Sequence, residues 1–117
     1  TDSWVPASRG HVPANAVQAG HERGAAIYAA RAWHEGDLIP AKVPKGHGCA
    51  FVGWNGKEHR KLDYEVLTST HPVSWVHDRD GRVPAQALPV GHTTSGETLY
   101  MGRAHHMGTL TPGKVSH

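Results

Sequence analysis

Two lysines occupy the same place in a tetrapeptide that occurs twice in the chain. Lys42 lies in the segment 40–43, Pro-Ala-Lys-Val, and Lys114 lies in the segment 112–115, Pro-Gly-Lys-Val. Lysine is almost never fully buried without a partner, so a hydrophobic core does not require it at either position. The repeated lysine therefore has one of three roles. It covers a strand edge, it belongs to an ion pair, or it is a fixed hydrogen-bond donor at a shallow site.

Each copy also contains a Gly-His pair that leads into a polar loop. His21 is followed by Glu22-Arg23-Gly24, and His92 is followed by Thr93-Thr94-Ser95-Gly96. A carboxylate that accepts and an ammonium that donates suit the adjacent hydroxyls of a pyranose, and charge roughly doubles the strength of each hydrogen bond. Trp33 and His105 occupy equivalent positions in the two copies. Their rings would either present a flat face to sugar C–H groups or pack between sheets.

Other kinds of chemistry have little support in the sequence. It contains no Gly-x-Ser-x-Gly elbow, no His-Glu-x-x-His, no phosphate loop and no dinucleotide fingerprint, so we expect neither catalysis nor a cofactor. Among the 11 histidines, His105 and His106 are adjacent and would point to opposite faces of a strand, so no metal site is predicted. A histidine-based metal or pH sensor is a weaker alternative. The one cysteine, Cys49, excludes an internal disulfide and is expected to be a small buried residue.

Length and composition limit the class of protein. The chain has 117 residues, which suits one domain, and its 14 glycines and 8 prolines favour short strands and turns. The net charge of +2 comes from scattered lysines and arginines, so we expect no nucleic-acid partner. No apolar run approaches the ~20 residues of a membrane helix, so no membrane insertion is expected. The N-terminus lacks the features of a signal peptide, which suggests a cytoplasmic or non-classically exported protein.

An internal repeat organises the chain. Trp4-Val5, residues 10–16 and Gly20-His21 recur at an offset of 71 (4 to 75), and residues 28–32 and 34–43 recur at an offset of 72 (28 to 100). We therefore divide the chain into a first repeat, 1–70, and a second repeat, 71–117. The second repeat contains no counterpart of residues 46–70, because of either truncation or a partner that supplies the missing part.

The repeat also decides the secondary structure. Residues 25–31 are rich in alanine, but their counterparts 97–103 contain Thr98 and Gly102, so both segments are predicted to be strands with Tyr28 and Ala30 on one face and Ala29 and Arg31 on the other. Residues 38–43 are predicted to form an edge or bulged strand because of Pro40. Residues 50–54, Asn55-Gly56 and Lys57 onward are predicted to form a hairpin, and residues 62–67 a closing strand. The predicted fold is all-β, with two tandem, pseudo-symmetric antiparallel β repeats packed into one domain as two small sheets around one core.

These residues together resemble the DM-nine repeat family over nearly the whole chain. The resemblance rests on Trp4-Val5, Gly10-x-Val12-Pro13-x-Asn15-Ala16, Ala19-Gly20, Tyr28-x-Ala30-Arg31-Ala32, Gly36-Asp37-Leu38-Ile39-Pro40-x-Lys42 and Gly56-Lys57-Glu58-His59 through Tyr64-Glu65-Val66-Leu67. It implies an all-β tandem protein that tends to form dimers. It also implies a mannose-recognising lectin of the innate-immunity type, with mannose or mannose-rich glycans as partners. The alternative is a non-lectin interaction or toxin-targeting β module.

The resemblance also assigns candidate sugar-binding residues. The family's acid falls at Glu22, in place of the usual aspartate, and the family's lysine falls at Lys42. His21 and Asp37 would line the rim of the same pocket. In the second repeat the equivalent positions are His92 and Lys114, but Thr93 stands at the position of the acid and Thr109 at that of Asp37.

Overall fold

The protein is described by a computed structural model covering residues 2–54, 56–71, 89–106 and 109–116, with side chains described as far as Met101. The described residues contain ten strands and no helix, so the all-β prediction is confirmed. The strands are β1 (Asp2–Ser8), β2 (Gln18–Glu22), β3 (Ala25–His34), β4 (Asp37–Pro44), β5 (Ala50–Trp54), β6 (Lys57–Lys61), β7 (Asp63–Ser69), β8 (Pro89–His92), β9 (Thr98–His106) and β10 (Thr109–Ser116). No helix in the described part of the chain is long and apolar enough to span a membrane.

All ten strands belong to one antiparallel sheet, whereas we had predicted two separate small sheets. Each repeat contributes a three-strand meander, β2-β3-β4 from the first and β8-β9-β10 from the second. Leu38 of β4 pairs with His92 of β8, and Leu110 of β10 pairs with His21 of β2. The pairings therefore run from β2 through β3, β4, β8, β9 and β10 back to β2. Each meander covers both edges of the other. Two separate sheets would have left these edges exposed.

The two junctions between the meanders are equivalent under the sequence repeat. His21 and His92 correspond at the offset of 71 (21 to 92), and Leu38 and Leu110 at 72 (38 to 110). The strands at these junctions also share an irregularity, because the register shifts at Gln18/Gly20 in β2 and at Pro89/Gly91 in β8. The internal repeat of the sequence is thus a pseudo-twofold relation between the meanders.

Tight two-residue turns shape the first meander. Arg23 and Gly24 (φ 50° and 80°) join β2 to β3, and Glu35 and Gly36 (φ 52° and 83°) join β3 to β4. Positive φ at both central positions is the geometry of the type I′ turn, whose twist matches that of the flanking strands. Glycine at the second position adopts that geometry without steric cost.

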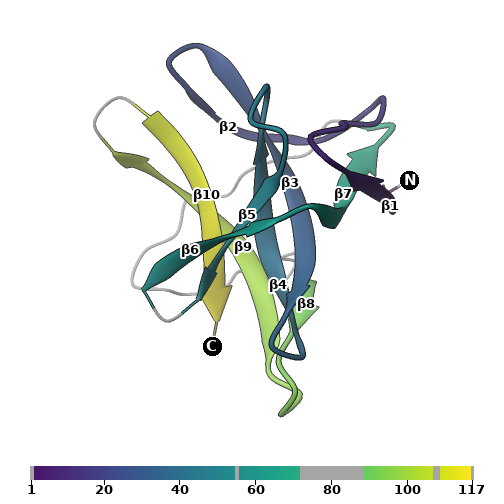
Figure 1. Ribbon diagram of the computed structural model, residues 1–117, viewed down its shortest axis with the longest axis vertical. Helices are drawn as coiled ribbons and strands as arrows, with labels where there is room; N and C mark the ends of the chain where they lie inside the picture. Colours follow the sequence, from purple (N-terminus) through teal and green to yellow (C-terminus); the bar gives the residue numbers. More distant parts are fainter. Residues whose placement is uncertain (1, 55, 72–88, 107–108, 117) are drawn as a thin grey trace.

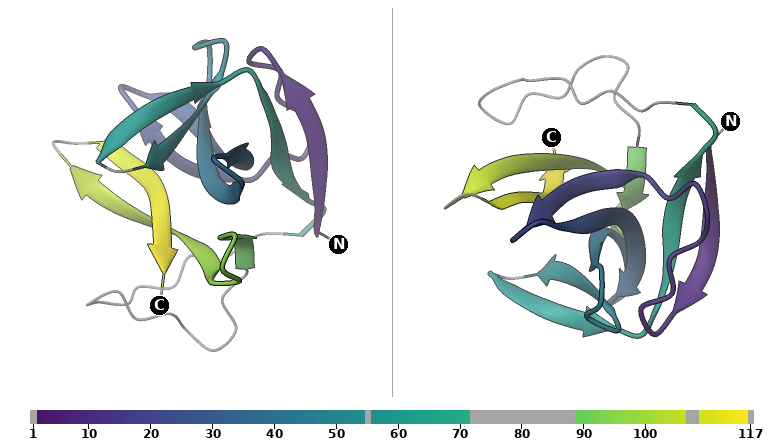
Figure 2. Two further views of the ribbon diagram at one scale, coloured as in Figure 1. Left: turned by 60° about the horizontal axis from the view of Figure 1, so that its bottom comes forward. Right: turned by 90° about the horizontal axis from the view of Figure 1, so that it is seen from above.

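Two further ribbons extend the first repeat. β7 pairs with β1 along seven residue pairs and with β3 at Ala30 and Arg31, whereas β5 pairs with β4 at Ala41 and Lys42 and carries β6 on its other edge. Figure 1 shows the β1–β7 ribbon beside β3. In the right-hand view of Figure 2, the β5–β6 ribbon and the β9–β10 ribbon lie on opposite sides of β2 and β3.

The core divides into two clusters on the two faces of β3. Ala30 belongs to the larger cluster, against which Tyr28 packs, and Ala29 belongs to the smaller cluster, as the predicted alternation requires. The guanidinium of Arg31 lies 4.3 Å from the centroid of the Trp4 ring, beside the smaller cluster. Cys49 is fully buried, as predicted.

Pro40 does not mark an edge strand, contrary to the prediction. β4 pairs with β3 along its whole length. On its other side it pairs with β8 at Leu38 and with β5 at Ala41 and Lys42. Pro40 falls between these two partners, where a missing N–H removes no ladder hydrogen bond on that side.

The predicted hairpin and closing strand are confirmed. Trp54 pairs with Lys57, Gly56 beside Lys57 has φ 73°, and β7 extends to Ser69, two residues beyond the predicted strand. Asn55 and Trp75 lie outside the described residues.

Candidate functional site

Lys42 forms an ion pair at the surface of β4 and β6. Its Nζ lies 3.2 Å from Oε1 of Glu58, and the two side chains are 23% and 53% exposed. Partly exposed pairs of this kind contribute only about 0–1 kcal/mol to stability. The pair therefore presents an ammonium and a carboxylate together at the surface. Replacing either residue should cost the fold little stability.

The hairpin register brings these two residues together. Lys42 pairs with Phe51 on β5, and Glu58 pairs with Gly53, two residues further along β5. Residues two apart on a strand share a face, so Gly53 lies between the two charged side chains on that face. A Cβ at Gly53 would have no atom within 4 Å, which leaves open space beside the pair.

Glu22 and Lys42 lie apart along β3, on the two strands that flank it. Glu22 pairs with Ala25 at the start of β3, and Lys42 pairs with Ala29 four residues further along. Four residues of strand span about 13 Å, which is more than one pyranose ring. Glu22 is exposed beside the Arg23-Gly24 turn, so it stands as a separate carboxylate.

Asp37 serves the fold rather than the rim of a pocket at Lys42. It is only 4% exposed and lies at the opposite end of β4 from Lys42. Its Oδ1 accepts a hydrogen bond of 2.7 Å from the backbone N–H of Thr94. The carboxylate thus connects the first repeat to the 93–97 turn of the second.

The other predicted residues lie at the two junctions or beyond the described side chains. His21 is half-buried and pairs with Ala26 on one side and Leu110 on the other. His92 is exposed, and its ring meets that of Trp33 edge-on with centroids 5.7 Å apart. Lys114 pairs with Met101 on β9, and its side chain is outside the described part.

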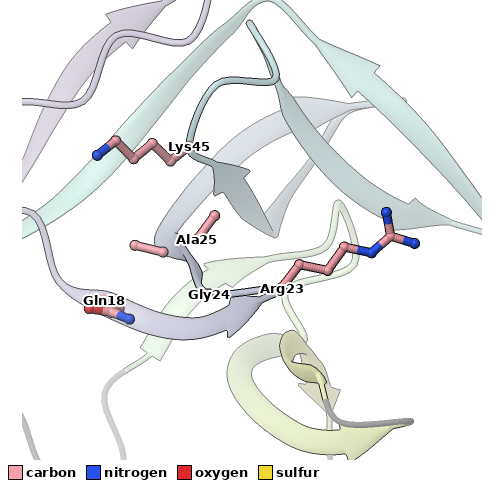
Figure 3. Close-up of a pocket in the computed structure, with 6 residues that line it drawn as sticks. Gln18, Arg23, Gly24, Ala25 and Lys45 are labelled. Carbon is pink, nitrogen blue, oxygen red and sulfur yellow. The ribbon is translucent and has the colours of Figure 1, made fainter.

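None of these site residues lines either of two shallow hollows in the described structure. One, of about 630 Å³, is lined by Gln18, Arg23, Gly24, Ala25, Ala26 and Lys45, and a second, of about 460 Å³, shares Lys45. Figure 3 shows the side chains of Arg23 and Lys45 pointing in opposite directions. The two cations therefore do not converge on one anion.

A ring cluster occupies the end of β3. His34 stacks on His59 with centroids 4.4 Å apart, and Trp54 meets His34 edge-on at 5.7 Å. Desolvation, followed by the charges of Lys61 and His59, lowers the pKa of His34 below its ordinary value, against the opposing effect of Glu35 and Asp37. Within the described side chains, no three His, Cys, Asp or Glu residues gather as a metal site would require.

The fold and this arrangement define a small all-β tandem-repeat module with a partly exposed ammonium–carboxylate pair on its first repeat. The sequence matches the family described as the DM9 repeat over residues 22–117. Because this match covers most of the chain, the protein belongs to the DM9 repeat family, as its motifs predicted. No curated protein matches the chain.

Proposed function

We propose that the protein is a carbohydrate-binding module without catalytic activity, which recognises mannose-type glycans through Lys42 and Glu58. The observation that carries the proposal is the 3.2 Å ion pair between these residues, partly open to solvent beside Gly53. Membership of the DM9 repeat family supports it, because Lys42 lies in the motif by which the chain resembles that family's lectins.

The chemistry of the pair suits adjacent sugar hydroxyls. The ammonium of Lys42 donates to hydroxyl oxygens, and the carboxylate of Glu58 accepts hydroxyl protons. Charged groups form the stronger hydrogen bonds, which offsets the loss of equally good bonds between the sugar and water. One such site binds weakly because a small polar ligand offers little apolar area. Dimerisation, which stays a prediction, would raise the apparent affinity for branched glycans by multivalency.

The first experiment is a glycan array followed by calorimetric titration with a mannose-rich oligosaccharide. We expect the wild-type protein to bind mannose-rich glycans, Lys42→Ala to abolish binding and Glu58→Gln to weaken it about tenfold, or about 1.4 kcal/mol. Both variants should unfold within about 1 kcal/mol of wild type, because the pair is partly exposed. Lys45→Ala is the matched control, since Lys45 is an exposed lysine three positions further along.

Two results would contradict this assignment. Unchanged binding by the Lys42→Ala variant would remove the lysine from the site, and Glu22→Gln would then test the separate carboxylate. An array on which wild-type protein binds no glycan would remove the lectin function itself. The DM9 module would then be an interaction module of another kind.

A further inference from the structure

We propose a second sugar contact at the junction of β3, β4 and β8, where Trp33 and His92 form a platform for the apolar face of a pyranose. The inference deepens the proposed function and rests on it. It concerns different residues, since Trp33 and Leu38 lie four residues along β3 and β4 from the Ala29–Lys42 pair, or about 13 Å. The site at Lys42 and Glu58 would hold hydroxyls, and the platform would hold a ring face.

Four adjacent strands supply one row of residues at this junction. Trp33 pairs with Leu38, Leu38 pairs with His92, and His92 pairs with Thr98 on β9. Trp33, His92 and Thr98 are exposed, whereas Leu38 is buried between them. The row thus offers an indole, an imidazole and a hydroxyl to solvent, with no charged side chain among them.

Trp33 is unusual because a large apolar ring stands open to water. It is 58% exposed, so it does not pack between sheets, the alternative role considered for it from the sequence. No hydrogen bond joins its indole N–H to any described residue. An indole presents a flat apolar face together with one hydrogen-bond donor, as the alternating C–H and hydroxyl surface of a sugar requires.

His92 gives the platform a polar rim. Its ring meets Trp33 edge-on at an interplanar angle of 75°, so the two rings form a corner rather than a single flat surface. Its Nδ1 lies 3.4 Å from the carbonyl oxygen of Thr93, a contact in which the nitrogen is the donor. In that tautomer Nε2 is left as an acceptor for a sugar hydroxyl.

Hydrogen bonds on both sides of the row fix its geometry. Arg31, two residues before Trp33, donates from Nη1 to the carbonyl of Val90 at 3.1 Å, and Val90 lies two residues before His92. Beyond the row, Asp37 accepts from the N–H of Thr94 at 2.7 Å. A platform that is already ordered loses little conformational freedom when a ligand binds.

The size of the patch favours a sugar over a protein partner. The other exposed large apolar residue among those described is Leu62, between β6 and β7. A stable protein interface needs about 800 Å² on each partner, with several apolar anchors near its centre. One indole with an imidazole at its edge offers far less area, but it is comparable to one pyranose ring.

The sequence repeat places a related row at the other junction. Leu110 pairs with both His105 and His21, in the same way that Leu38 pairs with Trp33 and His92. Histidine stands there in place of the indole. The tryptophan platform is therefore a property of the first junction.

The test is a calorimetric titration of the mannose-rich oligosaccharide into wild type, Trp33→Ala, Trp33→Tyr and Leu62→Ala, with tryptophan fluorescence recorded in parallel. We expect Trp33→Ala to weaken binding about tenfold, or about 1.4 kcal/mol. Trp33→Tyr, which keeps an aromatic face, should retain most of the affinity. Leu62→Ala, which removes the other exposed apolar side chain, should bind like wild type. Saturating glycan should change the emission of wild type more than that of Trp33→Tyr.

The outcomes separate this inference from the proposed function. If wild type binds glycan and Lys42→Ala does not, but Trp33→Ala keeps wild-type affinity, the platform is overturned and the proposed function stands. If wild type binds no glycan, both are overturned. Because Trp33 is largely exposed, all variants are expected to unfold close to wild type, and thermal unfolding checks this.

Discussion

Histidine is the most abundant ionisable residue of the chain, and the structure places its copies in different surroundings. His21 and His92 lie at the two strand junctions, whereas His34, the last residue of β3, stacks on His59 in the middle of β6. Two imidazoles 4.4 Å apart repel when both are charged. The stacked pair is therefore one place where protonation should affect the fold.

The stacked pair predicts how stability depends on pH. Because the folded-state pKa of His34 lies below its ordinary value of 6.5, the unfolded chain binds a proton first as the pH falls. Stability attributable to His34 is thus complete above about pH 6.5 and decreases as the pH falls toward the lowered pKa. His34→Gln should flatten this dependence, as measured by urea unfolding between pH 7.5 and 5.0. His71→Gln, a control at an exposed histidine, should keep the wild-type profile, and an unchanged profile in His34→Gln would refute the role of the stack.

At the level of single residues, the sequence singled out the lysine of the proposed site but not its ion-pair partner. Lys42 stood out because the same tetrapeptide occurs twice. Glu58 was missed, although a two-residue Asn-Gly turn places Trp54 opposite Lys57 and so Gly53 opposite Glu58. The missing step was the partner strand of β5, since only the pairing of Lys42 with Phe51 brings Glu58 near the lysine. Asp37 looked available because it is charged, whereas a backbone N–H from the other repeat satisfies it.

At the level of elements, the close approach of β8 to β4 depends on one glycine. A Cβ at Gly91 would lie 1.9 Å from the carbonyl oxygen of Leu38, so no side chain fits there without moving the backbone. Gly53 on β5 is also a strand glycine, but a Cβ there would meet no atom within 4 Å. The two glycines thus form a matched pair that differs in packing.

This difference predicts opposite outcomes for one substitution. Gly91→Ala should destabilise the protein by about 3 kcal/mol or more, because overpacking displaces backbone that also carries the Leu38–His92 pair. Gly53→Ala should change stability by less than about 1 kcal/mol. Chemical denaturation of both variants compares them directly. Equal stability of the two would show that the β4–β8 junction is looser than its geometry indicates.

Several strands were predicted from local signals, whereas β1, β2 and β8 were not, nor were the long-range partners of the strands. Alternation and the repeat identified β3, and the Asn-Gly turn identified β5 and β6, because these signals are local. The pairing of β4 with β8 and of β10 with β2 joins residues far apart in the sequence, and no local pattern fixes it. Pro40 was predicted at an edge for the same reason. The sheet tolerates a proline there because it lies between the segments of β4 that pair with β8 and with β5.

At the scale of the whole molecule, the two repeats share one sheet and one core cluster. The radius of gyration of 13.2 Å matches the roughly 13 Å expected of a compact domain of this length. Leu99 of the second repeat belongs to the larger core cluster, whose other members all come from the first. Four described connections cross between the repeats through backbone groups: the Leu38–His92 pair, the Leu110–His21 pair, the Asp37–Thr94 hydrogen bond and the Arg31–Val90 hydrogen bond.

This arrangement predicts that the first repeat does not fold by itself, even though it carries the proposed sugar-binding pair. In a fragment of residues 1–71, the junction positions on β2 and β4 would have no partner strand. The larger core cluster would also lack Leu99. We expect that fragment to show no cooperative thermal transition and to bind no glycan, whereas the full chain unfolds in one step. Circular dichroism during heating provides the measurement. A fragment that unfolds cooperatively near the transition temperature of the full chain would mean that the repeats are independent domains, and that the junctions join two units which are already folded.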